Sequence, residues 1–271
     1  MRQFALINSI GQRWDLNQEN SFLSSPKGLG GERKITYTQI GNSFVELENL
    51  LKQKSITGKI VFDDYGMFEE FSLFAQHSPL ILVYKTQREY RIQVEMTKLT
   101  KTEMENIGLV GDIMLQGLTA WYRQENVENG NTAEGKKFPY AYDYLYTENG
   151  MGILEVESDS IEESPIKLII AGPCVNPSWS LYRNGEVQTT GKVFCTIEKD
   201  NRLVIDTTRI PYEIAEYGND NVMIRDLYQS SDFETERFLF AGYGKTKIVV
   251  TQEGNTTQYV AMEVRIEYGT I

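Results

Sequence analysis

The stretch Glu89-Tyr90-Arg91-Ile92-Gln93-Val94-Glu95-Met96-Thr97-Lys98-Leu99 alternates apolar and polar side chains with a period of two. This pattern is typical of a β-strand with one buried face. Further strand-like segments surround it in the first half: Phe4–Ile7, Gln12–Leu16, Lys34–Gln39, Ser43–Leu51, Ser55–Phe62, Leu80–Lys85 and Leu109–Trp121. A segment rich in Ser, Gly and Pro, Ser24–Gly31, is expected to be a loop. The first half is therefore predicted to be a β-domain.

One helix is predicted among these strands, over Tyr65–Gln76. The side chains expected to face the strands are Met67, Phe68, Phe71, Leu73 and Phe74. Their spacing suits one face of a helix, and His77-Ser78-Pro79 should end it. One helix beside so many strands indicates a β-domain with a helical cover.

The second half shows nine short strand-like segments and no helical pattern. They are Gly152–Glu157, Ile166–Ala171, Ser178–Arg183, Gly191–Ile197, Arg202–Asp206, Val222–Leu227, Phe238–Ala241, Thr246–Gln252 and Gln258–Tyr268. Turn residues such as Asn184-Gly185 and Lys199-Asp200-Asn201 separate them. Short strands at regular spacing predict a β-sandwich or jelly roll.

A boundary between the two halves is predicted at Gln124–Gly150. This segment begins polar and rich in Gly and Asn, and then places tyrosines at positions 140, 142, 144 and 146. A plain flexible linker would not carry four tyrosines, so we expect the segment to pack against a domain or a neighbouring subunit. The expected organisation is a domain over 1–123, an aromatic-rich connector over 124–150 and a second domain over 151–271.

The charge of the chain argues against a nucleic-acid partner. The net charge is −11; residues 1–150 carry 16 Lys and Arg against 19 Asp and Glu, and residues 151–271 carry 11 against 19. An acidic surface repels phosphate backbones. The N-terminal apolar run is too short for a signal peptide, and no stretch has the roughly 20 apolar residues of a membrane helix. We therefore expect a protein made in a cytoplasm, without a membrane partner.

Residues suited to catalysis or metal binding are scarce. His77 is the single histidine, and no Cys, Asp or Glu accompanies it at ligand spacing. The two cysteines, Cys174 and Cys195, are expected to be reduced and buried, although a disulfide between them is conceivable. Gly244-Lys245-Thr246 resembles the end of a phosphate-binding loop, but the first glycine of that motif is replaced by Leu239. No catalytic, cofactor-binding or metal-binding residue is predicted, and no cofactor.

Paired carboxylates leave a glycosidase open as an alternative. The neighbouring acidic pairs are Asp63-Asp64, Glu69-Glu70 and Glu162-Glu163. Asp63-Asp64 directly precede the predicted helix, where carboxylates cap the N-terminus. Glu69-Glu70 are expected on its solvent side, and Glu162-Glu163 in a polar turn. A pair brought together only by folding would not be visible in the sequence, so absence of an enzyme is a prediction.

A carbohydrate-binding β-sandwich that contacts the host cell wall is the main alternative function. Tyr and Trp side chains on a sheet can stack on sugar rings, and Trp179 and Tyr182 lie in one predicted strand. Residues three apart on a strand point to opposite faces, so at most one of the two faces solvent. Trp179 is expected in the core.

Several phrases of the sequence resemble one family over nearly the whole chain. They are Arg2–Asn8, Gly11–Leu16, Pro26–Gly30, Tyr37–Phe44, Gly172–Trp179, Asp226–Phe233 and Arg237-Phe238. These phrases are similar to the distal tail (baseplate hub) proteins of Gram-positive phages and phage-tail-like particles. They are typical of the family without being chemical motifs, so they support kinship better than mechanism.

The resemblance implies a structural component of the virion tail tip. It implies an N-terminal β-domain with one helix that forms a hexameric ring, and a galectin-like C-terminal sandwich that projects outward. The implied partners are other copies of the chain, the major tail tube protein, the tail-associated protein and receptor-binding proteins. No cofactor, metal or catalytic residue comes with the family.

Overall fold

The computed structural model describes residues 2–104, 108–129, 152–254 and 259–271. The described chain is mainly β, with one α-helix, one short 3₁₀ helix and several antiparallel sheets. It divides into two compact units: Met1–Arg123 together with Tyr268–Ile271, and Gln124–Glu267. Most of the predicted connector, residues 130–150, lies outside the described residues. The first residues of the predicted connector, from Gln124 on, belong to strand β11 (Trp121–Glu128), where the sequence had suggested a polar linker.

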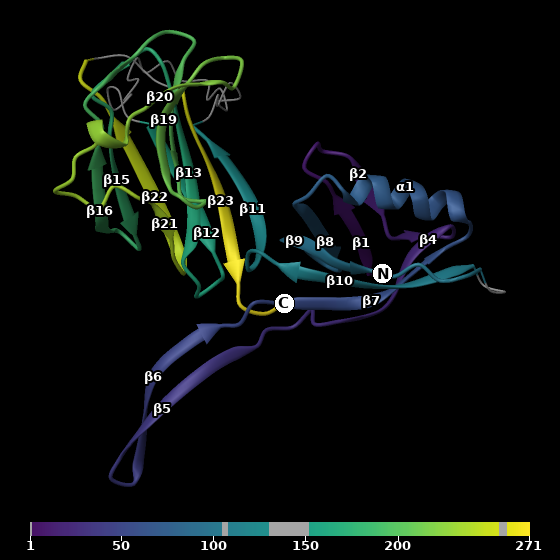
Figure 1. Cartoon of the computed structure of the whole chain (residues 1–271). Coiled ribbons are helices and arrows are strands. Elements are labelled where there is room, and N and C mark those ends of the chain that lie inside the picture. Colours follow the sequence, from purple (N-terminus) through teal and green to yellow (C-terminus); the bar gives the residue numbers. More distant parts are fainter. Residues whose placement is uncertain (1, 105–107, 130–151, 255–258) are drawn as a thin grey trace, which may run out of the picture. The chain divides into compact units, whose positions relative to one another are not determined.

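The first unit is built on one antiparallel sheet in the order β2-β1-β8-β9-β10-β7-β4-β3 (Figure 1). Its elements are β1 (Gln3–Ile7), β2 (Arg13–Asp15), β3 (Asn17–Gln18), β4 (Ser21–Lys27), β5 (Arg33–Ile40), β6 (Ser43–Leu51), β7 (Ser55–Phe62), α1 (Tyr65–Ala75), β8 (Leu80–Lys85), β9 (Glu89–Leu99) and β10 (Leu109–Gly117). Backbone hydrogen bonds from Leu16 to Phe4 and from Leu23 to Leu16 join the two ends of the sheet. The sheet therefore curls around a common core.

The helix α1 packs its phenylalanines onto that core, as predicted. Phe68, Phe71 and Phe74 are buried, and the Phe71 ring lies 5.4 Å from Trp14 and 5.3 Å from Phe62, centroid to centroid. Asp64 is the N-cap, and its Oδ1 accepts a hydrogen bond from the Met67 amide at 2.8 Å. The expectation for Leu73 was wrong: its side chain is 62% exposed, because the buried stripe is only as wide as the three phenylalanines.

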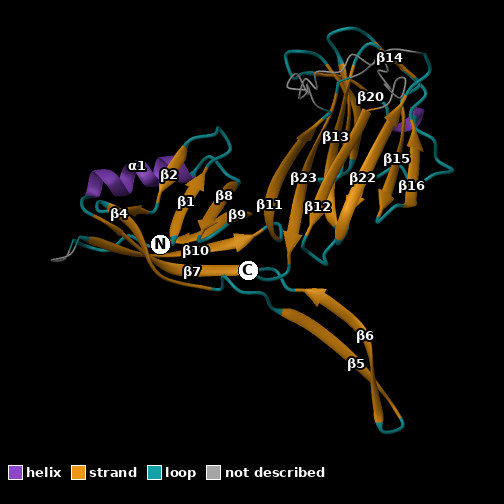
Figure 2. Ribbon diagram, turned by 180° about the vertical axis from the view of Figure 1, so that it is seen from behind, coloured by secondary structure: helices purple, strands orange, loops and turns teal. Residues whose placement is uncertain are grey.

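The second unit is built on two larger sheets that face each other (Figure 2), and β14 and β17 form a further two-stranded sheet. Its elements are β12 (Gly152–Ser158), β13 (Ser164–Ala171), β14 (Cys174–Val175), β15 (Ser178–Arg183), β16 (Glu186–Lys192), β17 (Thr196–Ile197), β18 (Arg202–Asp206), β19 (Glu213–Tyr217), β20 (Met223–Asp226), the 3₁₀ helix η1 (Tyr228–Ser230), β21 (Phe240–Ala241), β22 (Gly244–Thr251) and β23 (Val260–Tyr268). One sheet runs β20-β19-β18-β13-β23-β11, and the other runs β12-β22-β15-β16.

The core of the second unit comes from side chains that alternate along these strands. In β12 every second residue is buried, and Trp179 of β15 is 1% exposed, as expected for a core residue. Asn184 and Gly185 both have positive φ in the β15–β16 turn, which explains the choice of these residues there.

Several boundaries differ from the sequence prediction. Part of the predicted loop Ser24–Gly31 is strand β4, which pairs with β7 through a bulge between Ser24 and Lys27. The predicted strand Leu109–Trp121 is interrupted after Gly117. The strand β19 was not predicted, and Gly191–Ile197 is divided between β16 and β17. These segments are short or irregular, so their periodicity carries little information.

Candidate assembly surface

The strands β5 and β6 form a hairpin, which we call the hairpin arm (residues 33–51). It is a sheet of two strands that extends away from the rest of the first unit (Figures 1 and 2). The two strands are paired from Arg33 opposite Leu51 to Ile40 opposite Ser43, with a bulge between Thr36 and Tyr37. Gly41 takes a positive φ of 63° in the connecting turn, a conformation that glycine adopts without strain.

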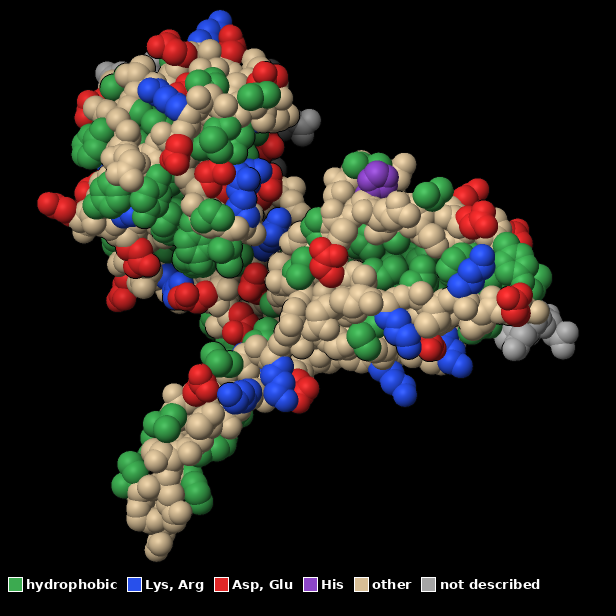
Figure 3. All heavy atoms as spheres, in the orientation of Figure 1, with side chains coloured by type: hydrophobic (Ala, Val, Ile, Leu, Met, Phe, Trp, Pro, Cys, Tyr) green, Lys and Arg blue, Asp and Glu red, His purple; other side chains and the backbone are tan. Residues whose placement is uncertain are grey.

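Large hydrophobic side chains of the hairpin arm are exposed on both strands (Figure 3). They are Ile35 (40% exposed), Tyr37 (54%), Ile40 (65%), Phe44 (70%), Val45 (45%), Leu47 (65%) and Leu50 (53%). Neither face of this sheet is covered within the described chain. An isolated two-stranded hairpin is at best marginally stable in water, and contiguous exposed apolar surface marks interaction sites. The hairpin arm is therefore suited to burial against another protein surface.

The root of the hairpin arm is fixed by polar contacts. Lys52 and Glu32 form an ion pair with 2.5 Å between Nζ and Oε1, and the Lys52 amide donates to the Glu32 carbonyl at 2.9 Å. The neighbouring Lys54 is 6% exposed, and its ammonium donates to the carbonyls of Gly30 at 2.9 Å and Gly269 at 3.2 Å. Burial lowers the pKa of this ammonium. These contacts hold the arm where it leaves the sheet.

The residues considered for catalysis lie on separate elements of the described chain. His77 is exposed beyond the end of α1, beside an open hollow of about 620 Å³ that Trp14, Glu70 and Leu73 also line. Across residues 2–104, 108–129, 152–254 and 259–271, no three His, Cys, Asp or Glu residues are grouped to hold a metal ion. No helix among those residues is long and apolar enough to cross a membrane.

The neighbouring glutamates lie near the surface, and the segment Gly244-Lys245-Thr246 lies in a strand. Glu69 and Glu70 are exposed on α1, and Glu163 is exposed in the turn before β13. Gly244-Lys245-Thr246 begins strand β22, where Thr246 is fully buried, so no helix follows as a phosphate-binding loop would require.

Cys174 and Cys195 are not joined by a disulfide. Cys174 is buried, whereas Cys195 is only partly buried. Burial, followed by the nearby Cys174, raises the pKa of the Cys195 thiol to about 11. A thiol with so high a pKa stays protonated at neutral pH and is a poor nucleophile.

The sequence did not reveal the exposure of the hairpin arm. A signal for it exists, because β6 has apolar side chains on both faces: the pairing with β5, which skips Leu47, places Phe44 and Leu51 on one face and Val45 and Leu50 on the other. A strand covered on one face does not need apolar side chains on both. The same pattern also suits a strand that is buried on both faces. Only the structure shows that β6 is exposed on both faces instead.

Residues 3–118, which include the hairpin arm, match the family model described as distal tail protein, N-terminal domain. The chain thus carries the N-terminal domain of the distal tail protein family. Distal tail proteins are structural components of the phage tail tip and baseplate, so this protein is a structural tail protein and not an enzyme.

Solved structures with the same fold extend over the whole chain. A chain of the phage P2 baseplate in its activated conformation with calcium superposes with a TM-score of 0.69 at 15% identity and full coverage of both chains. The SPP1 Dit protein, presented as a paradigm of hub adsorption apparatus in phages that infect Gram-positive bacteria, gives 0.63 at 8% identity. That match covers 98% of this chain and 99% of SPP1 Dit. No curated protein sequence matches significantly.

Proposed function

We propose that this distal tail protein forms a closed ring of six copies at the tail tip. In this proposal residues 1–123 build the ring, and the domain over 151–271 lies on its outside. The ring joins the major tail tube protein to the tail-associated protein and to receptor-binding proteins. The match to the family supports the place in the tail, and the number of copies and the named partners are the parts proposed.

The observation that carries the ring is the uncovered hairpin arm. Its seven large hydrophobic side chains are 40–70% exposed, and its backbone pairs only within the hairpin. A projecting arm and the surface that receives it are different patches, so the contact between copies is heterologous. Heterologous contacts produce closed rings when the rotation between neighbours closes. Burial of the arm against the next copy therefore supports a ring rather than a two-fold dimer.

The charge distribution supports an outward position for the second domain. Residues 151–271 carry 11 basic and 19 acidic residues, whereas residues 1–150 are nearly balanced. Like charges at short range oppose close packing of copies and favour solvation. An acidic domain is therefore better placed at the periphery than at the contacts of a ring.

Light scattering on the purified chain tests the ring. The proposal predicts one discrete species with a mass near six times 31.1 kDa, in equilibrium with little monomer at high concentration. Electron microscopy of the same sample should show rings with a central opening. A chain that stays monomeric at high concentration, both alone and with a purified tail tube protein, would contradict the proposal.

A further inference from the structure

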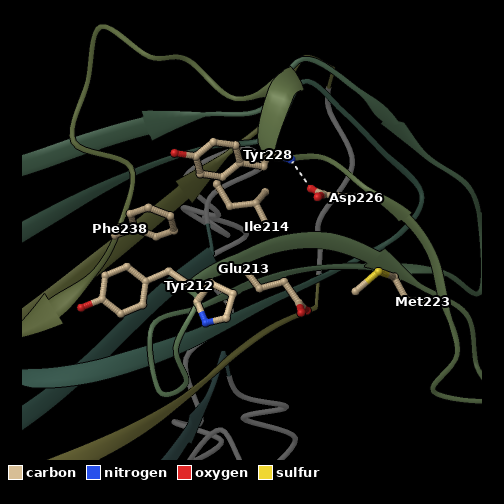
Figure 4. A pocket seen from close by; sticks show the side chains of 8 residues that line it. Tyr212, Glu213, Ile214, Met223, Asp226, Tyr228 and Phe238 are labelled. Atoms are coloured by element: carbon tan, nitrogen blue, oxygen red, sulfur yellow. Dashed lines mark hydrogen bonds between the residues drawn. The ribbon is translucent and has the colours of Figure 1, made fainter.

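A cavity of about 460 Å³ opens at the sheet edge of the second unit (Figure 4). Its volume lies within the range of roughly 300–1,000 Å³ that is typical of small-molecule sites. Its lining comes from β19, β20, η1 and the segments beside them, and includes Tyr212, Glu213, Ile214, Asp226, Tyr228 and Phe238. The proposed ring contacts do not involve this cavity.

One side of the cavity is a continuous aromatic wall. The Tyr212 and Phe238 rings lie 5.0 Å apart, and the Tyr228 and Phe238 rings lie 6.3 Å apart, centroid to centroid. Tyr212 is 40% exposed, so the wall is open to solvent. Phe238 lies nearly parallel to Tyr228, at 26°, and is tilted by 59° to Tyr212, so the three rings form one contiguous cluster without an aromatic cage for a cation.

Arg237 fixes two of these rings in place. Its guanidinium carbon lies 4.8 Å from the Tyr228 centroid and 5.6 Å from that of Phe238, and its Nη2 donates to the Tyr228 hydroxyl at 2.8 Å. Phe233 also stacks on this guanidinium, at 4.3 Å. A wall held this way is ordered before any ligand arrives, which reduces the entropic cost of binding.

Two carboxylates supply hydrogen-bond acceptors elsewhere in the cavity lining. Asp226 Oδ1 accepts from the Tyr228 amide at 2.7 Å, and Glu213 Oε1 accepts from Tyr217 at 2.6 Å and from Arg209 at 2.5 Å. In the described chain, the second oxygen of each carboxylate has no hydrogen-bond partner. Figure 4 shows Asp226 and Glu213 on the side of the cavity away from Tyr212 and Phe238.

We propose that this cavity binds a neutral saccharide. A pyranose ring offers an apolar C–H face, which packs on an aromatic ring, and hydroxyl donors around its edge, which carboxylates accept. Asp226, which forms no ion pair in the described chain, repels anionic sugars and phosphates, whereas the charge of Glu213 is balanced by Arg209 at 2.5 Å. An apolar peptide segment fits less well, because it would desolvate both carboxylates without offering them donors. The proposal does not depend on the ring, since it concerns a different unit of the chain.

The test measures binding of short neutral oligosaccharides of glucose, galactose, rhamnose and N-acetylglucosamine to the full chain by calorimetry and saturation-transfer NMR. Oligogalacturonate serves as the anionic saccharide for comparison. We expect at least one neutral saccharide to bind and Tyr212→Ala to weaken it about tenfold, the effect of about 1.4 kcal/mol. Tyr243→Ala is the matched control, because Tyr243 is 63% exposed and does not line the cavity.

Asp226→Asn separates recognition from folding. Asparagine can still accept from the Tyr228 amide, so the variant should unfold at the temperature of the wild type while binding the neutral saccharide more weakly. The proposal is overturned if no neutral saccharide in the panel binds, if oligogalacturonate binds better, or if Tyr212→Ala leaves binding unchanged. A different result would assign the cavity to a protein contact instead. In that case the wild type would bind no saccharide, and Tyr212→Ala would no longer bind another tail protein.

Discussion

The buried ammonium of Lys54 donates a hydrogen bond to the carbonyl of Gly269, 215 residues further along the chain, at 3.2 Å. The same ammonium donates to the Gly30 carbonyl at 2.9 Å, just before the hairpin arm begins. The Gly31 amide adds a third contact, to the Thr270 hydroxyl at 3.2 Å. The last residues of the chain therefore hold the root of the arm.

Lys54→Met should destabilise the protein, because two carbonyls lose a charged donor in a buried place. We expect a loss of about 1–3 kcal/mol in the free energy of unfolding, measured by urea denaturation. Lys85→Met serves as the control, since Lys85 is exposed at the end of β8. Equal effects of the two substitutions would show that the Lys54 contacts contribute nothing specific.

Phe71 and Leu73 offer a matched comparison on one helix. Phe71 is fully buried between Trp14 and Phe62, whereas Leu73 is 62% exposed. Phe71→Ala should cost about 3–5 kcal/mol of unfolding free energy through lost contacts and a cavity. Leu73→Ala should change it by less than about 0.5 kcal/mol. Similar losses for both would contradict the packing described for α1.

Asp64 gives a smaller and sharper test of the same helix. Its Oδ1 accepts from the Met67 amide, so Asp64→Ala should lower the free energy of unfolding by about 1 kcal/mol. Asp64→Asn keeps a side-chain acceptor at the N-cap, so it should lower the free energy of unfolding by only a few tenths of a kcal/mol. Thermal unfolding followed by circular dichroism distinguishes the two variants.

The sequence predicts best those elements whose packing is visible in their own periodicity. The ranges of β7, β8 and β9 are predicted as they occur, because each combines apolar side chains with clear turn residues at its ends. The helix follows from the spacing of its phenylalanines. In these elements the local pattern and the tertiary packing agree.

The candidate surfaces could not be predicted in the same way. Apolar residues of the hairpin arm, such as Ile35 and Leu47, have the composition of a buried strand, and only the structure leaves them exposed. The aromatic cavity collects Tyr212, Tyr228 and Phe238 from separate segments, one of which adjoins the unpredicted strand β19. In β19 the buried Glu216 forms an ion pair with Arg225 at 2.6 Å. Because a charged residue stands among the buried positions, the sequence of β19 lacks the apolar pattern of a strand.

Glu267 predicts a pH dependence of stability. Burial raises the pKa of its carboxyl to about 7 from an ordinary value near 4.5, against an opposing effect of Arg265. Between these values the folded chain binds more protons than the unfolded chain, so the free energy of unfolding falls as the pH rises from about 4.5 to about 7. Above about 7 the contribution is gone, because both states are deprotonated.

The variant Glu267→Gln isolates this effect from the other carboxyl groups. The difference in unfolding free energy between wild type and variant should change by about 2 kcal/mol across that pH range, which allows for solvent screening. Urea denaturation at a series of pH values measures it. A difference that does not change with pH would show that the Glu267 carboxyl titrates normally.

The central claim is that the hairpin arm is an assembly surface, and the oligomeric mass of two matched variants tests it most directly. Leu47 on the arm is 65% exposed and Leu73 on α1 is 62% exposed, so replacing either by serine removes a similar side chain from a similar environment. The account predicts that light scattering finds the Leu47→Ser chain shifted toward monomer, while Leu73→Ser keeps the mass of the wild-type oligomer. An unchanged oligomer in Leu47→Ser, confirmed with Phe44→Ser, would contradict it.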